Sequence, residues 1–546
     1  MSLPYAIWKN IKKDGFVKSP FAALRGILRH CGVAMEIVHR SPFTVSALFI
    51  DGQRSTVNGQ RIIGFARLAT EAFYCAVQTL TFCKIIKKGR TLFLLFALAA
   101  FLRPFPAYTA SAQLFSLIRD SKVSGNIWAR GTEDLRHDEP YEDTRTFRNK
   151  LFLEGKAQIE EHIRMVASVM SDYLWFHNDG SRDDLSTEMF EGYVEFSEQK
   201  WDIRAGNQIV RWGKADEISP VDNLNPQDLR ESITSRLEDR KLPVFMLRAR
   251  YFLSEGTIEG IYKPHFRSAK TEFFGSDWAT LKHLKTQVSH STALSQALKD
   301  YLTGLEIREK EYSTGLENGE AGLRFTGTVG NLDYGISYLY TRNPFPFIES
   351  FPIKNINVSS PSAEALLGQL AQAQLLDEDI IVAYERNQVI GAEVETTLGL
   401  FGIRGEAAYM TDQVFLKNDL TSTGKHILHY VLGIDRTFTN DWYANLQLYQ
   451  RKIFSYDDRI LFDHEFESGL FLRINKTLFH DKLRLNLDSF YNLTDNGFYL
   501  NPEVELRYVD NLSIFAGLNI FDGKADTFLG NYDRNDQGYL AVRFSF

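Results

Sequence analysis

The chain ends in Gln537-Gly-Tyr-Leu-Ala-Val-Arg-Phe-Ser-Phe546, and this stretch decides the fold. Read with a period of two, one face is apolar and holds Gly538, Leu540, Val542, Phe544 and Phe546. The opposite face is mixed and holds Tyr539, Ala541, Arg543 and Ser545. Alternation with this period is typical of a β-strand whose two faces meet different surroundings. The stretch therefore predicts an amphipathic strand, either at the edge of a soluble sheet or in the wall of a barrel.

A terminal strand that ends in Phe resembles the closing strand of bacterial outer-membrane β-barrels. That resemblance implies that Phe544 and Phe546 are the assembly signal of the strand. It also implies three partners: outer-membrane lipids, the barrel-assembly machinery and the secretory translocon. The oligomeric state stays open.

The composition favours strands and excludes some kinds of site. The 546 residues include 41 Phe and 24 Tyr but only 15 Pro, and aromatic side chains are enriched in strands. The net charge of −7 argues against a nucleic-acid surface. Cys31, Cys75 and Cys83 are the only cysteines, so the chain after residue 83 can form neither a disulfide nor a thiolate metal site.

Residues 81–112 are predicted to be a secretory signal peptide. A basic head at 84–90 is followed by an apolar core at 91–102 and by a small-x-small cleavage pattern at Ala110 and Ala112. The three parts in this order are typical of such signals, and the core is too short to span a bilayer as a helix. The alternative is a short buried helix.

The signal lies unusually far from the start of the chain. Residues 1–80 are therefore predicted to be an over-called start, and the alternative is a genuine, disordered extension. No function is taken from them. Residues 113–546 are the remaining domain, which has no long apolar run.

Short turns and long connections alternate throughout residues 113–546. The long connections are predicted at 212–244, 265–318 and 342–388, with polar loops at 177–184 and 412–425. An outer-membrane barrel has short periplasmic turns and longer outside loops. The pattern predicts a transmembrane antiparallel β-barrel of about 18 strands, or about 16, in the bacterial outer membrane.

Charged residues in the last strands alternate with apolar ones. Because an Arg that faces mid-depth lipid costs about 2–4 kcal/mol, we expect these side chains to line the lumen. The predicted lumen wall comprises Arg473, Arg484, Asp488, Glu503, Glu505, Arg507 and Arg543. These groups either bind cargo or satisfy one another.

The most distinctive motif is a strand that ends in Trp-Gly-Lys and is followed by an Asn-Pro-x-Asp loop. Its residues are Arg211, Trp212, Gly213, Lys214, Asp216, Asp222, Asn225, Pro226 and Asp228. The motif resembles a family of proteobacterial outer-membrane barrels of unknown function, and more distantly the alginate-export and porin-type barrels. The resemblance implies an outer-membrane barrel and leaves the cargo open.

The motif has two physical interpretations. A loop that folds into the pore with its charges paired would narrow it and act as an electrostatic filter. Alternatively, the same charges form a structural latch that holds the loop against the wall. In both, the motif is placed where the fifth strand leaves the membrane.

Two stretches in the long connections have helical spacing. Leu281, Leu284 and Val288 begin an apolar series that continues to Leu302, with Ser276 or Asp277 as a possible N-cap. Residues 362–376 are the second stretch. We expect short helices in the extracellular loops.

No catalytic or metal-binding spacing stands out, and no cofactor is predicted. The domain contains no Gly-x-Ser-x-Gly run, and His426, His429 and His464 are only weak candidates for a metal site at the rim. The sequence thus favours a non-enzymatic channel or transport barrel that passes small or hydrophobic solutes. The alternatives are a hydrolase active at the rim and a structural or adhesive barrel with a blocked pore.

Overall fold

The computed structural model describes residues 120–136, 143–177, 181–313, 316–358, 368–370, 372–524 and 527–546. The predicted extension and signal peptide, with Ala110 and Ala112, lie outside these residues. The same is true of much of the predicted helix at 362–376. In the described part of the chain, no helix is long and apolar enough to cross a bilayer.

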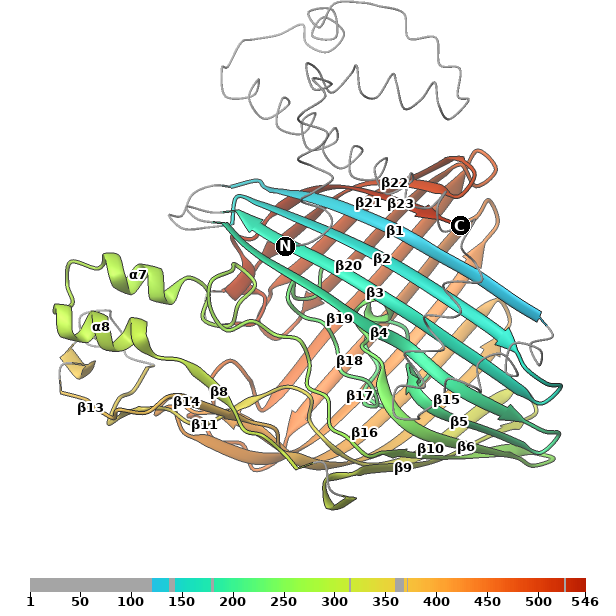
Figure 1. Ribbon diagram of the computed structural model, residues 1–546, viewed down its shortest axis with the longest axis horizontal. Helices are drawn as coiled ribbons and strands as arrows, with labels where there is room; N and C mark the ends of the chain where they lie inside the picture. Colours follow the sequence, from blue (N-terminus) through green and yellow to red (C-terminus); the bar gives the residue numbers. More distant parts are fainter. Residues whose placement is uncertain are drawn as a thin grey trace, which may run out of the picture. The chain divides into compact units, whose positions relative to one another are not determined.

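Eighteen strands form one closed antiparallel sheet (Figure 1). They are β1 (Asp120–Asp134), β2 (Arg145–Gln158), β3 (Ile163–His177), β4 (Ser181–Ser197), β5 (Trp201–Gln208), β6 (Val244–Phe252), β7 (Gly256–Lys263), β9 (Glu320–Val329), β10 (Leu332–Arg342), β15 (Arg386–Leu398), β16 (Phe401–Leu416), β17 (Ser422–Phe438), β18 (Trp442–Ile453), β19 (Phe466–Leu478), β20 (Leu483–Asn492), β21 (Phe498–Val509), β22 (Leu512–Asp522) and β23 (Gln537–Ser545). Each strand pairs with the next of these, and β1 also pairs with β23. The prediction of an 18-stranded barrel is confirmed.

The C-terminal strand closes the barrel, so it is not the edge of an open sheet. Asp134 of β1 lies opposite Gln537 of β23, and the register continues to Asn126 opposite Ser545. Beyond it, the backbones of Gly125 and Phe546 exchange two hydrogen bonds of 3.0 Å. A Cβ at Gly125 would lie 2.5 Å from the Phe152 carbonyl oxygen, so only glycine fits this junction.

The connections are sorted between the two ends of the barrel largely as predicted. Two polar loops are shorter than expected, because β4 begins at Ser181 and because β16 and β17 leave only residues 417–421 between them. The charged pair Asp183-Asp184 was interpreted as loop, yet both residues belong to β4, and Asp184 forms an ion pair with Arg230. The polarity of these two residues predicted a turn, but they lie in a strand, where Asp184 is paired with a charged side chain.

The two faces of the wall differ in chemistry. Large apolar side chains are exposed on the outside, with Ile336 61% and Leu432 57% exposed. Inward neighbours on the same sheet include the buried carboxylates Glu393 and Glu406. An apolar outer belt around a polar interior is the pattern of barrels that face lipid.

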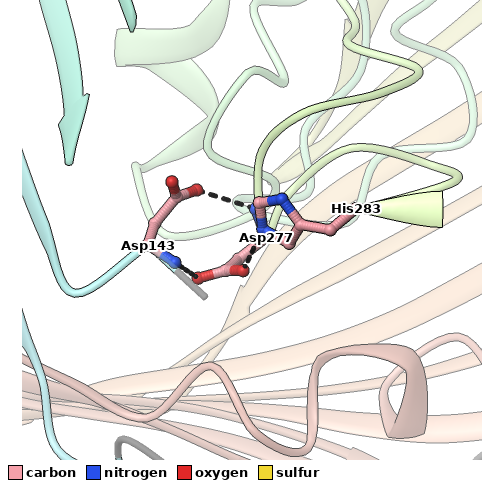
Figure 2. Close-up of side chains that lie close together, drawn as sticks. All are labelled: Asp143, Asp277 and His283. Atoms are coloured by element: carbon pink, nitrogen blue, oxygen red, sulfur yellow. Dashed lines mark hydrogen bonds and ion pairs between the residues drawn. The ribbon is translucent and has the colours of Figure 1, made fainter. Parts of the chain in front are cut away.

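The long connection between β7 and β9 contains two short helices, α7 (Leu284–His290) and α8 (Gln296–Gly304). The predicted N-cap at Ser276 or Asp277 is wrong: Ser295 caps α8, whereas Asp277 binds the Asp143 backbone and His283 (Figure 2). A turn precedes α7 because Asp277 is held by these tertiary contacts.

Small sheets also stand at the long-loop end of the barrel (Figure 1). One joins β8 (Ile307–Glu309), β11 (Phe347–Ser350) and β14 (Ile380–Ala383). The other pairs β12 (Ile353–Lys354) with β13 (Gln374–Leu375), so the end of the predicted 362–376 helix is a strand.

Candidate functional site: the luminal loop

Residues 209–243, between β5 and β6, form a loop that lies inside the barrel; we call it the luminal loop. Gln208 and Val244 are register partners, so a tight turn could have joined these strands. The chain instead runs into the lumen, where Trp212 is 1% exposed, and forms the short helix α6 (Leu237–Arg240). The motif thus lies within the barrel, not where β5 leaves the membrane as the sequence analysis placed it.

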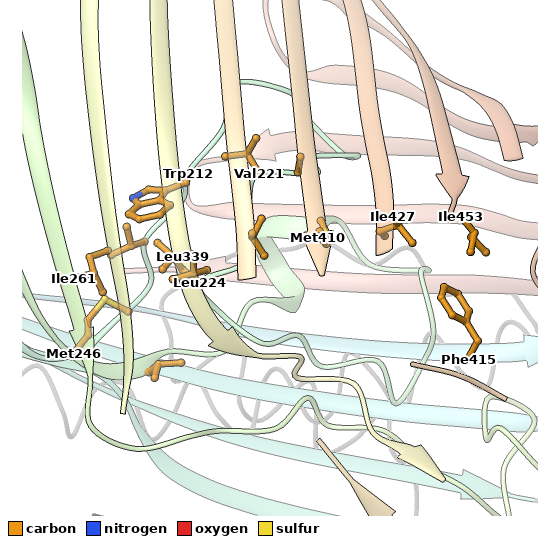
Figure 3. Close-up of a cluster of buried hydrophobic side chains, with 14 of the residues drawn as sticks. Trp212, Val221, Leu224, Met246, Ile261, Leu339, Met410, Phe415, Ile427 and Ile453 are labelled. Carbon is orange, nitrogen blue, oxygen red and sulfur yellow. The ribbon is translucent and has the colours of Figure 1, made fainter. Parts of the chain in front are cut away.

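Residues 209–224, the apolar arm, pack against the inside of the wall (Figure 3). Val210, Trp212, Val221 and Leu224 share one buried cluster with wall residues. These wall residues are Val244, Met246, Ile261, Leu339, Val389, Ala408, Met410, Phe415, Ile427 and Ile453. The Trp212 indole also donates a 3.0 Å hydrogen bond to Glu259 on β7, so its one polar atom is satisfied.

The apolar arm wraps around one carboxylate, that of Glu406 on β16. Glu406 accepts hydrogen bonds from the backbone amides of Lys214, Ala215 (2.5 Å) and Val221 (3.4 Å), and from the Ser219 hydroxyl (2.7 Å). Gly213 makes the turn possible: its φ is +97°, and a Cβ there would clash with the Ser219 hydroxyl. Amide dipoles converging on a carboxylate give strong, charge-assisted hydrogen bonds.

Charged side chains join the same arm to β15 through β19. Lys214 lies 3.1 Å from Glu395, and Asp216 lies 3.0 Å from Arg404. Glu217 pairs with Arg473 at 3.3 Å. Arg211 turns back on its own arm and donates to the Asp216 carbonyl oxygen at 2.6 Å.

Asn225 and a buried ion pair hold the neck of the loop. Asn225 accepts from the Val210 amide and donates to the carbonyl oxygens of Gln208 and Leu242, each at 2.9 Å. The Pro226 carbonyl oxygen accepts from the Leu242 amide at 2.8 Å. Asp222 pairs with Lys241; burial raises the pKa of Asp222 and lowers that of Lys241 despite their mutual attraction.

Residues 226–232, the ionic arm, bind the opposite wall. Arg148 of β2 lies 2.6 Å from Asp228 and 2.7 Å from Glu231. Arg230 of the loop in turn lies 2.6 Å from Asp172 of β3. Arg130 of β1 also pairs with Glu231.

The charges of the ionic arm are held in their ionised forms. Burial alone would raise the pKa of Asp228, but Arg148 and Arg230 outweigh it and hold this pKa far below its usual value. The pKa of Glu231 is lowered in the same way by Arg130 and Arg148. The network is buried, so its members depend on one another for charge compensation.

The luminal loop leaves a cavity of about 430 Å³ between α6 and the wall formed by β1 and β19 to β23. Six of the seven predicted wall residues line it: Arg484, Asp488, Glu503, Glu505, Arg507 and Arg543. The seventh, Arg473, binds Asp488 beside the cavity through two hydrogen bonds of 2.7 and 2.8 Å. Arg507 binds Glu505 in the same two-pronged way, at 2.7 and 2.6 Å.

The predicted site residues therefore fall into separate groups. The motif residues up to Asp216 lie on the apolar arm, Asp222, Asn225 and Pro226 hold the neck, and Asp228 lies on the ionic arm. The anchors Glu406, Arg148 and Glu231 were missed. A carboxylate between Gly405 and Ala407, two residues after Arg404 and so on the same face of the strand, was the sequence signal for Glu406.

Among the described residues, one group has ligand types suited to a metal: Asp143, Asp277 and His283 (Figure 2). All three are buried, and their ligand atoms lie within 4.8 Å of one another. Each aspartate accepts the other's backbone amide, at 2.8 and 2.9 Å, and His283 lies 2.8 Å from Asp277. These contacts also fasten the β1–β2 connection to the β7–β9 connection without any ion.

The three histidines considered for a rim metal site do not form such a group in the described structure. His464 pairs with Asp495 at 2.6 Å, and His426 stacks on Tyr409. His429 is directed at the Tyr449 ring.

The strand pairing and the luminal loop define this protein as a porin-like β-barrel with a loop folded into its lumen. The chain belongs to the family described as "Protein of unknown function (DUF1302)", whose model matches residues 177–457. The luminal loop lies within the matched residues. No curated protein matches the chain.

Several solved barrels are similar in structure. OccAB3 of Acinetobacter baumannii is 11% identical, with 79% of this chain and 100% of that chain covered and a TM-score of 0.42. OpdK of Pseudomonas aeruginosa, solved with vanillate, is 8% identical, with 79% and 99% covered and a TM-score of 0.42. OmpF of Salmonella typhi, solved with daunomycin, is 8% identical, with 78% and 97% covered and a TM-score of 0.35. The likeness to alginate-export barrels stays a prediction.

Proposed function

We propose that this protein is an outer-membrane channel whose luminal loop narrows the pore and selects small solutes. The observation that carries the proposal is the closed barrel with a charged cavity left beside the folded-in loop. A pore lined by fixed charges at a constriction selects by size and by charge. The apolar belt fits a bilayer, and the bacterial outer membrane is where such barrels reside.

The two predicted cargo classes are small solutes and hydrophobic solutes, and small solutes with polar groups suit the cavity better than hydrophobic ones. Its lining includes six guanidinium groups: Arg130, Arg236, Arg240, Arg484, Arg507 and Arg543. A purely apolar solute would leave these groups partly dehydrated without offering them a hydrogen bond. A barrel blocked by the loop is the second candidate, because the loop reaches both walls of the lumen.

The test replaces residues 209–243 with a short Asn-Gly turn. The register of Gln208 opposite Val244 permits this, because strands that end side by side can be joined by two residues. Single-channel conductance is then measured in planar bilayers, with protein purified from outer membranes of cells that express the whole chain. The control deletes residues 285–303 in the β7–β9 connection, where α7 and α8 lie outside the barrel (Figure 1).

We expect small conductance steps for the unchanged protein and for the control, and larger steps for the loop replacement. If all three proteins insert but pass no current, the channel proposal is wrong. If the loop replacement alone conducts, the natural barrel is blocked and its function is structural or adhesive. Recovery in the inner-membrane or soluble fraction would contradict the proposed location.

A further inference from the structure

The cavity beside α6 contains a guanidinium that the wall does not neutralise. Arg473 is bound by Asp488, Arg507 by Glu505 and Arg240 by Glu217. In the described part of the chain, Arg484 has no carboxylate within ion-pair distance, and its Nε is buried without a hydrogen-bond partner. Its Nη2 has only the Asn475 amide oxygen, at 3.0 Å in the better amide orientation.

Most of the charged groups that act most strongly on Arg484 are cations. Arg236, Arg473 and Arg507 are all close enough to repel it, and Glu505, its register partner on β21, already binds Arg507. Arg543 lines the same cavity and packs over the Phe515 ring at 5.4 Å, also without an ion pair among the described residues. A cation in a partly dehydrated site is unfavourable unless an anion joins it.

The shape of the Arg484 guanidinium indicates which kind of anion it would bind. The Nε and one terminal nitrogen of a guanidinium form a planar fork that matches the two oxygens of a carboxylate. Arg473 and Arg507 bind carboxylates in this way in the neighbouring wall. Arg484 has the same fork, with its Nε directed at no acceptor in the described chain.

The other residues that line the cavity limit the size and charge of the rest of the ligand, beyond its carboxylate. Phe471, Phe490 and Phe515 supply aromatic surface, and a cavity of about 430 Å³ is large enough for a small organic molecule. Glu503 also lines it, bound by the neutral Tyr539 hydroxyl at 2.9 Å and the Asn486 amide at 3.0 Å. A second negative charge on the ligand would be repelled by Glu503, so a monoanion fits best.

We infer that this cavity binds a small organic monocarboxylate, with Arg484 as the residue that receives the carboxylate and the aromatic residues in contact with the body. The inference rests on the proposed channel, because it names the class of solute that the lumen retains.

Isothermal titration calorimetry with sodium benzoate tests the inference on the whole protein in detergent. Benzamide, a neutral molecule of the same shape, and benzylamine, a cation, are titrated in parallel. The variant is Arg484→Gln, and the matched control is Arg459→Gln, which removes the same charge from an exposed loop. We expect Arg484→Gln to weaken benzoate binding about ten- to a hundred-fold, as loss of a charge-assisted hydrogen bond does, and Arg459→Gln to leave it unchanged.

Arg484→Lys is a second variant, which tests the site even if Arg484→Gln does not fold. It keeps the charge but loses the fork, and we expect an intermediate affinity. Equal benzoate affinity in the unchanged, Gln and Lys proteins would overturn the inference, as would benzamide or benzylamine binding as tightly as benzoate.

The two proposals fail separately. Silent bilayers together with benzoate binding that depends on Arg484 would overturn the channel and keep the site. A conducting protein whose benzoate affinity ignores Arg484 would overturn the site and keep the channel.

Discussion

The two arms of the luminal loop are anchored by different forces. The apolar arm buries Trp212 in a hydrophobic cluster and supplies neutral donors to Glu406. The ionic arm has little apolar contact and is held by buried charges around Arg148 and Arg230. Hydrophobic burial is insensitive to pH, whereas the ionic arm depends on the protonation of Asp228 and Glu231. The ionic arm is therefore the one that acidification should release first, because the apolar arm keeps its hydrophobic cluster even when its own ion pairs weaken.

The largest effect is expected from Arg148→Met. It removes the cation that Asp172, Asp228 and Glu231 share and leaves buried carboxylates undercompensated, which costs about 3–5 kcal/mol of the free energy of unfolding. Equilibrium urea unfolding in detergent measures it. Arg145→Met is the control, since Arg145 is on the same strand but exposed, and we expect at most about 1 kcal/mol there. If both variants lowered the free energy of unfolding equally, the buried network around Arg148 would add no stability.

The second-largest effect is expected from acidification, which should loosen the ionic arm before the apolar arm. Asp228 and Glu231 have pKa values lowered by folding, so their stabilisation is complete above their usual pKa values of about 4 and is lost as the pH falls further. Hydrogen exchange measured by mass spectrometry, corrected for intrinsic rates, should show residues 226–232 losing protection below about pH 4 while residues 210–221 keep theirs. Earlier loss in the apolar arm would reverse the comparison.

The smallest effect is expected within the apolar arm itself. Ser219→Ala removes one of the donors to Glu406 and leaves the backbone amides, so it should cost about 1 kcal/mol in the same urea experiment. Ser289→Ala on α7, an exposed position outside the barrel, should cost close to nothing. A loss near that of Arg148→Met would show that the donors to Glu406 act as one unit.

Much of the barrel could be predicted because its wall repeats one physical contrast. Every strand has lipid on one face and the lumen on the other, so Leu483 and Leu485 alternate with Arg484 and Asn486, and each return of the chain is marked by a turn. The strand count follows from these local patterns. The polar Asp183-Asp184 was misplaced because the partner that keeps Asp184 in a strand, Arg230, is distant in sequence.

The luminal loop could be recognised as distinctive but not placed. Lys214 and Glu406 are joined through space, and neither residue carries a local sign of the other. The same holds for Asp277, whose partner Asp143 lies on another connection and overrides the helix start that local spacing favours. Nothing in the spacing of Arg484 revealed that it lacks a carboxylate partner among the described residues.

The position of the loop's partners along the chain imposes an order on folding. The ionic arm binds Arg148 and Asp172, which precede it, whereas the apolar arm needs Glu406 and β18, which follow it by about 190 residues or more. Contacts across such separations form late, because the intervening chain must first be ordered. The loop can be held by its first wall as soon as β1 to β4 have paired, and it reaches its final position only when the later strands arrive. Most of the barrel has therefore already formed by the time the apolar arm of the loop reaches its final position.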